Sequence, residues 1–562
     1  MNRTRAQESR AAIEKLYVMM RHLFMRGFYK PLGVSGEALR SALLSLRPEI
    51  YGVIADPEKV ELNGLAYVIE RLPKGIEQCR FIKLTADEGY AESKFPTIIP
   101  SKRRRRCFRI DKETMYIEVT RGRSEIYDIL THLTFLYVEA DKIRRYALDD
   151  KGNVTRQWEK LAEIAHGDVR ITDENKEKAL VYLSGMLGRT FHETQAAYTR
   201  FEESSEDHNG LFKVIYSLGK QAIEETNGKK LRQVSFTPAL RERIGHHIHG
   251  SVWAQNIKRT LKEHGLIDRP IHIISANLHS VMNSLYAYPA LAAAKEKTGS
   301  ILEMATALSK SNAKRNQNLI REYAEANGLL EIPDSSGTNI GVQLIDTQQL
   351  KWKSLSPEIS RLDTKSQKAA PVLLVMDYAF GEQAFETVDE LVKPYKEDGQ
   401  VIPLDIQSVN IMGKAGILTG GKGDIMIPNA HVFEGTADNY PFDNDLSIED
   451  FKDDQLPVYA GPMITVLGTS LQNKDVLSYF RHSSWKAIGL EMEGAHYQKA
   501  IQAASKIRCT INSDVVLRYA YYASDNPLHT GSTLASGPLG EVGVRPTYLI
   551  TVKILNKIFE RK

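Results

Sequence analysis

Ile271-His272-Ile273-Ile274-Ser275 follows Arg269-Pro270 and marks a change in the texture of the chain. A short run of apolar, largely β-branched residues predicts a strand buried on both faces. Apolar residues at helical spacing follow this run, and a second apolar run with a helix-like stretch after it stands at residues 371–376. Strands that alternate with helices predict an α/β fold with a mostly parallel central sheet flanked by helices.

This pattern continues to the end of the sequence and predicts a domain over residues 266–562. Further strands are expected at 401–412, 424–428, 463–467 and 517–523, and long helices at about 301–327, 490–506 and 546–560. Residues 1–265 read differently, with amphipathic helical stretches at 5–27, 125–147, 174–203 and 211–226 and few strands. We therefore expect a mainly helical N-terminal domain over 1–265, and no motif assigns it a role.

Composition limits the classes of protein. The chain has 562 residues, of which 42% are hydrophobic and 26% charged, with a net charge of +4, as in a soluble globular protein. Its three cysteines lie far apart and form no CxxC pair, so we expect neither a disulfide framework nor a zinc knuckle, and a cytoplasmic location. No apolar run approaches the ~20 residues that span a bilayer, so no membrane partner is expected.

Two charged or histidine-rich clusters have ordinary explanations. Residues 102–106 read KRRRR and could contact nucleic acid, but a solvated loop or an oligomer contact is the preferred interpretation. His246, His247 and His249 have no matched carboxylate in the sequence, so no metal site is expected there.

Leu490-Glu491-Met492-Glu493-Gly494 places two carboxylates and a thioether at the start of a predicted helix. Residues two positions apart on a helix are separated by roughly 200° of rotation, so both glutamates cannot face one ligand. One of them is expected to be solvated or to cap backbone amides, where negative charge is favourable.

Ala523-Ser524-Asp525-Asn526-Pro527-Leu528-His529 places a carboxylate at the end of a predicted strand, before a proline turn. Sites of α/β proteins form at this edge of the sheet, although an Asp in such a place can also merely shape an Asx-turn. A carboxyl that donates a proton needs a pKa raised by partial burial, and the aromatic run before Asp525 could supply it.

A glycine-rich run at 413–424 permits two interpretations. Gly416 to Lys422 fits the GxxxxGK spacing of a P-loop, but Gly423 replaces the hydroxyl residue that would hold magnesium. A strand-like segment follows the run where a P-loop requires a helix. A turn between two strands is therefore preferred.

Taken together, the LEMEG and SDNPLH motifs resemble the purine nucleoside phosphorylase and nucleosidase superfamily, and SDNPLH is most similar to its AMP nucleosidase branch. The resemblance covers about residues 266–562. It implies that Glu493 binds the ribose hydroxyls, that Met492 packs on the sugar, and that Asp525 protonates N7 of a purine. A second Ser-Asp pair ends at Asp514, 21 residues after Glu493 rather than 32, which is closer to the usual family spacing. The longer match favours Asp525.

The same resemblance extends to weaker positions. Superfamily phosphorylases carry an arginine three residues before the position of Lys414, where this chain has Ile411, and this disfavours phosphorolysis. Lys414 either binds a substrate phosphate as a point charge or pairs with a carboxylate. The remaining substrate-binding positions expected from the resemblance are Gly381 and Glu382 in a turn before a helix, His279 after the first strand, Phe433 as a base-stacking aromatic, and Ser470 in a base-pocket loop. Each of these also fits ordinary packing or capping.

The function that this resemblance implies is hydrolysis of the N-glycosidic bond of an AMP-like purine nucleotide or nucleoside, with release of free base and ribose or ribose 5-phosphate. No metal or cofactor is expected. A phosphate-dependent purine nucleoside phosphorylase, a non-catalytic purine nucleotide sensor and a P-loop enzyme are the alternatives. By analogy with the superfamily we expect a homo-oligomer, with no nucleic acid partner.

Overall fold

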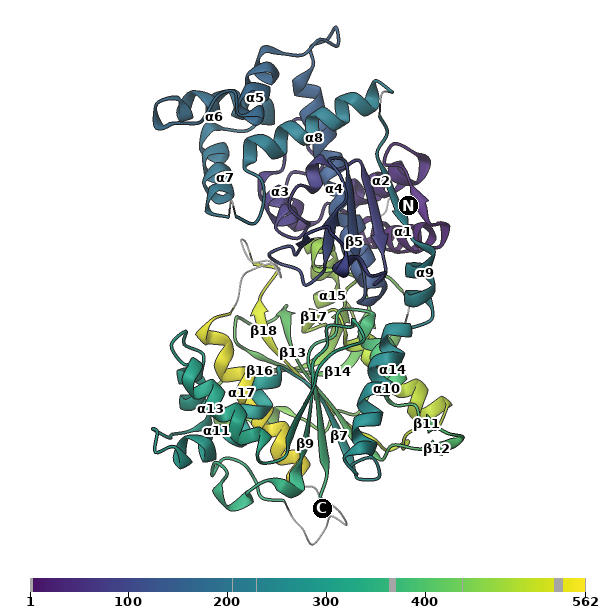
Figure 1. Cartoon of the computed structure of the whole chain (residues 1–562), viewed down its shortest axis with the longest axis vertical. Helices are drawn as coiled ribbons and strands as arrows, with labels where there is room; N and C mark the ends of the chain where they lie inside the picture. The colour runs from purple at the N-terminus through teal and green to yellow at the C-terminus, as the bar shows by residue number, and fades with distance from the viewer. Residues whose placement is uncertain are drawn as a thin grey trace. The chain divides into compact units, whose positions relative to one another are not determined.

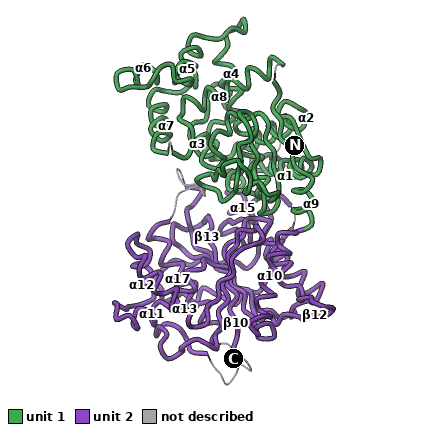
Figure 2. The backbone as a smooth tube through the Cα atoms, viewed as in Figure 1, with its two compact units in different colours: residues 1–246, 467–476 green, residues 247–466, 477–562 purple. Residues whose placement is uncertain are grey.

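The computed structural model describes residues 4–204, 206–228, 230–362, 370–436, 438–529 and 539–560. It contains two compact units (Figure 2): unit 1 is Met1–His246 with Leu467–Val476, and unit 2 is His247–Val466 with Leu477–Lys562. Unit 1 therefore includes a short segment from the C-terminal half of the chain. The domain boundary expected from the sequence, between residues 265 and 266, places this segment in the C-terminal domain.

Unit 1 is mainly helical, as expected, and it also contains a six-stranded sheet in the order β1-β6-β2-β5-β4-β3. Its strands are β1 (Phe28–Tyr29), β2 (Phe81–Thr85), β3 (Thr97–Ile98), β4 (Cys107–Arg109), β5 (Thr114–Glu118) and β6 (Gln233–Phe236). Its helices are α1 (Arg5–Arg26), α2 (Val34–Leu46), α3 (Leu62–Ile69), α4 (Gly122–Ala147), α5 (Arg156–His166), α6 (Asp173–Leu187), α7 (Phe191–Glu203), α8 (Leu211–Thr226) and α9 (Pro238–Gly245). Capping boxes begin α1 and α7, where Thr4 pairs with Gln7 and Thr190 with Glu193.

Unit 2 is built on a ten-stranded sheet. Its strands are β7 (Ile271–Ser275), β8 (Leu329–Ile332), β9 (Val342–Asp346), β10 (Val372–Met376), β13 (Ile406–Ile417), β14 (Ile425–Phe433), β15 (Asn439–Pro441), β16 (Val458–Thr465), β17 (Gly489–Glu491) and β18 (Val516–Asp525). A separate hairpin joins β11 (Tyr395–Glu397) and β12 (Gln400–Ile402). Every residue of β7, β9 and β10 is buried. Burial on both faces explains why β10 is apolar throughout and why β7 and β9 are mostly apolar.

Helices cover both faces of this sheet, as Figure 1 shows for α11, α13 and α17 on one side and α10 and α14 on the other. The first group packs with Ile274, Met412 and Tyr522 in one apolar core, and the second with Ile273, Ile411 and Tyr521 in another. The helices of unit 2 are α10 (Ile248–Glu263), α11 (Leu278–Ala293), α12 (Ile301–Leu308), α13 (Lys314–Glu325), α14 (Gln383–Leu391), α16 (Gly494–Gln502) and α17 (Glu541–Phe559), together with most of α15 (Lys474–His482), whose first three residues belong to unit 1.

Part of the sheet closes on itself. β13 pairs with β18, β18 with β14, β14 with β16, β16 with β17, and β17 returns to β13. This ring places the ends of distant strands around one long strand, β13, which also pairs with β7.

The expectation of an α/β domain with helices on both faces of its sheet is met, but a mostly parallel sheet is not confirmed. Among the described residues the sheet is mixed: β7–β10, β7–β13, β13–β18, β14–β16 and β16–β17 are parallel, whereas β9–β10, β8–β9, β13–β17, β14–β15 and β14–β18 are antiparallel. Closing the ring requires some of these antiparallel pairs.

Two expected helices have different bounds. The helix expected at 490–506 begins at Gly494, because residues 489–491 pair with β13 and β16 as strand β17. The helix expected at 301–327 is two helices, α12 and α13, which are separated at residues 309–313.

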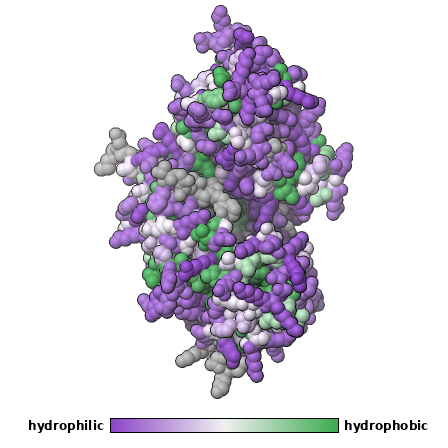
Figure 3. Space-filling view, turned by 90° about the vertical axis from the view of Figure 1, so that its left-hand side faces the viewer, coloured by the Kyte–Doolittle hydropathy of each residue, from purple (hydrophilic) through white to green (hydrophobic). Residues whose placement is uncertain are grey.

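Among the residues that the structure describes, no helix combines the length and apolarity needed to cross a bilayer. Hydrophilic residues predominate on the face drawn in Figure 3.

Candidate functional site

Glu491 ends β17 and caps the helix that follows. Its Oε1 accepts a hydrogen bond from the Thr465 hydroxyl at 2.5 Å, and its Oε2 accepts from the backbone amides of Glu493, at 2.6 Å, and Gly494. These amides would otherwise lack partners at the start of α16. Burial raises the pKa of Glu491 to about 7. Of the two glutamates in the motif, Glu491 is thus the one that caps backbone amides.

Glu493 occupies the position before α16 and has a different environment. Its Oε1 accepts a hydrogen bond from the backbone amide of Gly381 at 2.8 Å. Gly381 has a φ of +54°, a left-handed conformation that favours glycine, in the turn between β10 and α14. Burial, and the negative charge of Glu491, raise the pKa of Glu493 to about 8. The backbone amide of Gly381, an expected substrate-binding position, is therefore bonded to the protein's own carboxylate.

Asp525 is the last residue of β18 and is almost fully buried, with 5% of its surface exposed. Its Oδ2 has no hydrogen-bond partner among the described residues. Burial raises its pKa, whereas the Ser524 hydroxyl and the charges of Lys414 and Lys422 lower it. A buried carboxyl with one oxygen unpaired has the features of a proton donor to a ligand.

The neighbours of Asp525 hold it in place. Asn526 donates from Nδ2 to the carbonyl of Gly420 at 2.9 Å, which ties the end of β18 to the glycine-rich turn. The Ser524 hydroxyl lies 3.0 Å from the carbonyl of Ala415 and 2.5 Å from Oδ1 of Asp525. This hydroxyl has one proton and cannot donate to both. It donates to Asp525 when the carboxylate is charged, and it is free to donate to Ala415 when Asp525 carries its own proton.

The two motifs meet across β13. Gly416 pairs with Leu490 of β17 on one edge and with Asp525 of β18 on the other. Neighbouring strands lie roughly 4.8 Å apart, so the backbones at Leu490 and Asp525 are on the order of 10 Å apart. Residues that are far apart in sequence are thus brought to adjacent strands at one point of the ring.

Phe433 and Glu382 lie near the first turn of α16. The ring of Phe433 makes an edge contact with His496, with 4.8 Å between centroids, and a second with Tyr440 at 6.1 Å. Glu382 acts on His496 through its charge, and burial lowers the pKa of His496 to about 4. Met492 lies between the two glutamates and is partly exposed. Glu382 and Phe433 therefore both act on His496 in the first turn of α16, the helix that Glu493 precedes.

Lys414 and His279 lie together in a pocket of about 780 Å³ on the α11 side of the sheet. Tyr522, which pairs with Lys414 in the sheet register, also lines this pocket. Lys414 is exposed and acts on Asp525 through its charge, so the pocket adjoins the end of β18.

Ser470 and Asp514 have different surroundings from Asp525. Ser470 belongs to the segment included in unit 1, where it is buried and hydrogen-bonds the Tyr51 side chain. Asp514 is exposed and precedes the first residue of β18, whereas Asp525 is its last residue. The two Ser-Asp pairs are therefore at opposite ends of the same strand.

One cluster consists of residue types that can bind a metal ion. His247, Asp389 and Glu390 offer ligand atoms within 4.8 Å of one another, so His247 does have carboxylates nearby that the sequence did not reveal. Asp389 already pairs with Arg508 at 2.6 Å and Lys393 at 3.3 Å, and Glu390 pairs with Lys393 at 2.6 Å. Cations of the protein neutralise these carboxylates.

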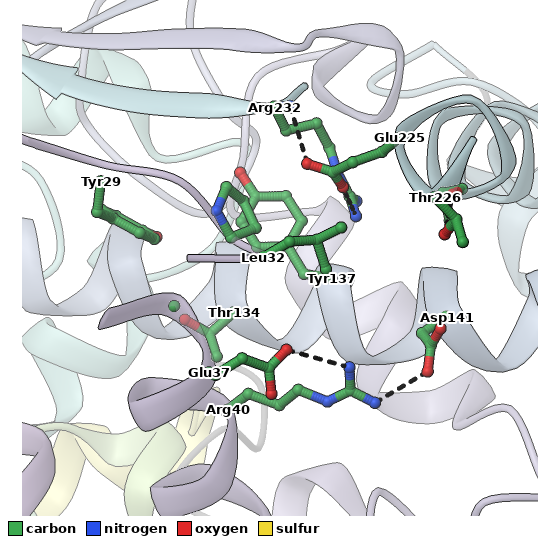
Figure 4. Close-up of a pocket in the computed structure, with 13 residues that line it drawn as sticks. Tyr29, Leu32, Glu37, Arg40, Thr134, Tyr137, Asp141, Glu225, Thr226 and Arg232 are labelled. Atoms are coloured by element: carbon green, nitrogen blue, oxygen red, sulfur yellow. Dashed lines mark hydrogen bonds and ion pairs between the residues drawn. The ribbon is translucent and has the colours of Figure 1, made fainter. Parts of the chain in front are cut away.

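Unit 1 has a small cavity of about 30 Å³ (Figure 4), which is comparable to the volume of one water molecule. Arg232 pairs there with Glu225 at 2.5 Å, and Arg40 pairs with Asp141 at 2.9 Å. The cavity is too small for a nucleotide.

The basic run at 102–106 is part of the fold of unit 1. Arg103 and Arg105 both pair with Asp128, at 2.7 and 2.5 Å, and Arg106 pairs with Glu118 at 2.5 Å. These pairs neutralise much of the charge that could attract nucleic acid.

Several residues that shape the site were not identified from sequence. Thr465 and His496 belong to no sequence motif. Their contacts with Glu491 and Phe433 at the start of α16 arise only in the folded chain. Lys314 and Arg321 line the same pocket as Lys414. Their spacing of seven residues puts both on one face of a helix, and this spacing could have been recognised.

A family model matches most of the chain. The chain belongs to a family of unknown function (DUF6909), which matches residues 37–318 and 301–560. No curated protein matches it.

Solved structures match about half of the chain, and they are of the class that the two motifs resemble. A 5′-methylthioadenosine/S-adenosylhomocysteine nucleosidase from Campylobacter jejuni is 13% identical, with 52% of this chain and 99% of that chain covered and a TM-score of 0.31. An AMP nucleosidase from Bacteroides thetaiotaomicron is 13% identical, with 56% of this chain and 99% of that chain covered and a TM-score of 0.30. A futalosine hydrolase from Helicobacter pylori is 12% identical, with 51% of this chain and 98% of that chain covered and a TM-score of 0.31. Similarity at this level decides nothing about the activity of this chain.

Proposed function

We propose that unit 2 hydrolyses the N-glycosidic bond of an AMP-like purine nucleotide or nucleoside. The observation that carries the proposal is the buried carboxyl of Asp525 at the end of β18, with Oδ2 unpaired and its pKa raised by burial. Burial favours the protonated form of such a carboxyl, and a protonated carboxyl can give its proton to a base. The exposure and position of Asp514 support the choice of Asp525 as the acid.

In the proposed reaction the bond between C1′ of the ribose and N9 of the purine breaks, and its electron pair stays with the base. Asp525 donates its proton to N7, so the base leaves neutral. Glu493 accepts hydrogen bonds from the ribose hydroxyls, Met492 packs on the sugar, and Phe433 contacts the base. Interactions that strengthen as positive charge develops on the sugar lower the barrier.

Water completes the reaction. Its oxygen binds C1′, one of its protons stays on the new hydroxyl, and the other restores the proton of Asp525. Glu382, next to the turn that contacts Glu493, is the proposed group that orients this water. Neither a metal nor a cofactor enters the scheme. Ser470 as a base-pocket residue, a cytoplasmic location and a homo-oligomer stay predictions of the sequence.

The test is base release. Full-length protein is incubated with AMP, adenosine and inosine, with and without phosphate, and free base is measured by chromatography. We expect release without phosphate, and a loss of at least ~10²-fold in Asp525→Asn. Asp514→Asn is the matched control, because it makes the same change in the other Ser-Asp pair and is expected to keep activity.

Two results would contradict the proposal. Release that depends on phosphate and yields ribose 1-phosphate would indicate a phosphorylase. Tight binding of AMP with no base released under any condition would indicate a nucleotide sensor.

A further inference from the structure

The pocket that contains Lys414 has no role in the chemistry proposed above beyond its place next to Asp525. It lies within unit 2, where α11, α12, α13 and the start of α17 surround the sheet residues Lys414 and Tyr522. Its volume of about 780 Å³ is within the range of small-molecule sites, about 300–1,000 Å³. We call it the α13 pocket.

Positive charge dominates the lining of the α13 pocket. Lys314, Arg321 and Lys414 all line it, together with His279, and no Asp or Glu is among the described residues that do so. Arg321 pairs at 3.5 Å with Glu331 outside the pocket, but both side chains are well exposed, so the pair is weak and can open for a ligand.

Two helices add partial positive charge. Asn277 and His279 come from the beginning of the 16-residue α11, and Gly540 and Gly543 come from the beginning of the 19-residue α17. The amino ends of long helices favour anions because their first backbone amides lack partners within the helix. Side chains and helix ends thus favour the same kind of ligand.

The α13 pocket is also connected to the candidate acid. Lys414 is on β13 two residues before Gly416, which pairs with Asp525 in the sheet, and the charge of Lys414 lowers the pKa of the Asp525 carboxyl. A ligand that contacts Asp525 at one end can therefore reach Lys414 at the other. In a purine nucleotide, the sugar separates the base from the 5′-phosphate.

We infer that the α13 pocket binds the 5′-phosphate of the substrate, with Lys414 nearest the sugar and Lys314 and Arg321 beyond it. The inference rests on the proposed function for the base and ribose, and it makes a phosphorylated nucleoside the substrate class rather than a free nucleoside.

Binding of ribose 5-phosphate tests the α13 pocket without any bond cleavage. Titration calorimetry on the full chain compares ribose 5-phosphate, ribose and inorganic phosphate. We expect ribose 5-phosphate to bind and ribose not to bind, and Lys314→Gln and Arg321→Gln each to weaken binding by about tenfold, as for a lost charged hydrogen bond. Arg315→Gln is the matched control, because Arg315 lies on the same helix, is 84% exposed and is outside the pocket. Its binding should stay within twofold.

The outcomes separate this inference from the proposed function. If wild type releases base from AMP and adenosine equally well and no variant changes ribose 5-phosphate binding, the α13 pocket is not the phosphate site, and the nucleosidase activity stands. If ribose 5-phosphate binds as expected but no base is released, the pocket stands as a sugar-phosphate site and the proposed reaction is wrong. Inorganic phosphate binding as tightly as ribose 5-phosphate would overturn the assignment to the substrate.

Discussion

Glu493 accepts a hydrogen bond from the backbone amide of Gly381 at 2.8 Å, and this bond links the start of α16 to the turn after β10. The carboxyl is nevertheless in an unfavourable place for a charge, because burial and Glu491 raise its pKa to about 8. A buried carboxyl whose ionised form is disfavoured lowers stability, and such groups are typical of ligand-binding sites.

Replacement of this carboxyl should therefore stabilise the protein in a pH-dependent way. With a folded-state pKa above the unfolded value, the folded protein binds more protons, so Glu493 lowers the free energy of unfolding as pH rises from about 4.5 to about 8. Glu493→Gln removes this effect and keeps an acceptor for the Gly381 amide. We expect its melting temperature to exceed that of wild type at pH 8 and to match it at pH 5, measured by calorimetry.

The same variant should lose binding of the sugar. Base release from AMP by Glu493→Gln, measured near pH 8 where the wild-type carboxyl is partly ionised, is expected to fall by at least ~10-fold, because a neutral amide stabilises developing positive charge less than a carboxylate does. A variant that is more stable at pH 8 and equally active would show that Glu493 has no role in the reaction.

The Ser524 hydroxyl should set the alkaline limit of activity. Its hydrogen bond lowers the pKa of Asp525, so Ser524→Ala should raise that pKa further. An acid works only while protonated, so the fall of kcat/KM at high pH should move to higher pH in this variant. The measurement is the pH profile of base release. Ser513→Ala, the same change in the exposed pair at the other end of β18, should leave the profile in place.

Gly494 ends the LEMEG motif for a steric reason. A Cβ at this position would contact the ring of His431 and would lie 2.8 Å from Oε1 of Glu491. Gly494→Ala should lower the free energy of unfolding by about 1–3 kcal/mol, as overpacking does. Gly185→Ala is the control, because nothing lies within 4 Å of its added Cβ and α6 should gain roughly 0.5–1 kcal/mol. Urea unfolding of both variants measures the difference.

The elements that could be predicted from the sequence are those whose own residues favour the observed structure. β7 and β10 were recognisable because strands buried on both faces are rich in apolar, β-branched residues. Strand β17 was not, because its three residues are held as a strand by β13 and β16 rather than by their own preference. This difference moved the start of α16 to Gly494 and gave the two glutamates separate roles.

The site was predictable to a similar extent. Asp525 and Glu493 stand out through their motifs. The pairing of Gly416 with both Leu490 and Asp525, which brings the two motifs to strands on either side of β13, depends instead on the closure of the ring. The inclusion of residues 467–476 in unit 1 depends on contacts with distant residues such as Leu46, whose carbonyl accepts a hydrogen bond from Asn473 at 2.7 Å. No local pattern encodes such a contact.

The basic run of unit 1 provides the last prediction. Asp128 accepts hydrogen bonds from Arg103 and Arg105 and contacts His132 at 3.2 Å. Burial opposes ionisation of Asp128, but its interactions with Arg103 and His132 outweigh burial and hold its pKa well below the usual value. Asp128→Asn leaves buried cations without their counter-charge and should cost about 3–5 kcal/mol of stability. Hydrogen exchange of the α4 amides, followed by mass spectrometry, should show much faster opening.

The matched variant for this prediction is Asp87→Asn. Asp87 is 42% exposed and pairs with Arg106 at 3.4 Å, so its loss should cost only about 0–1 kcal/mol. The stabilisation from Asp128 is present above its unfolded-state pKa and is lost as pH falls through the lower folded value. Wild type and Asp128→Asn should therefore differ most near neutral pH and converge in strong acid. Equal protection of α4 in the two proteins at pH 7 would mean that the basic run is not held by Asp128.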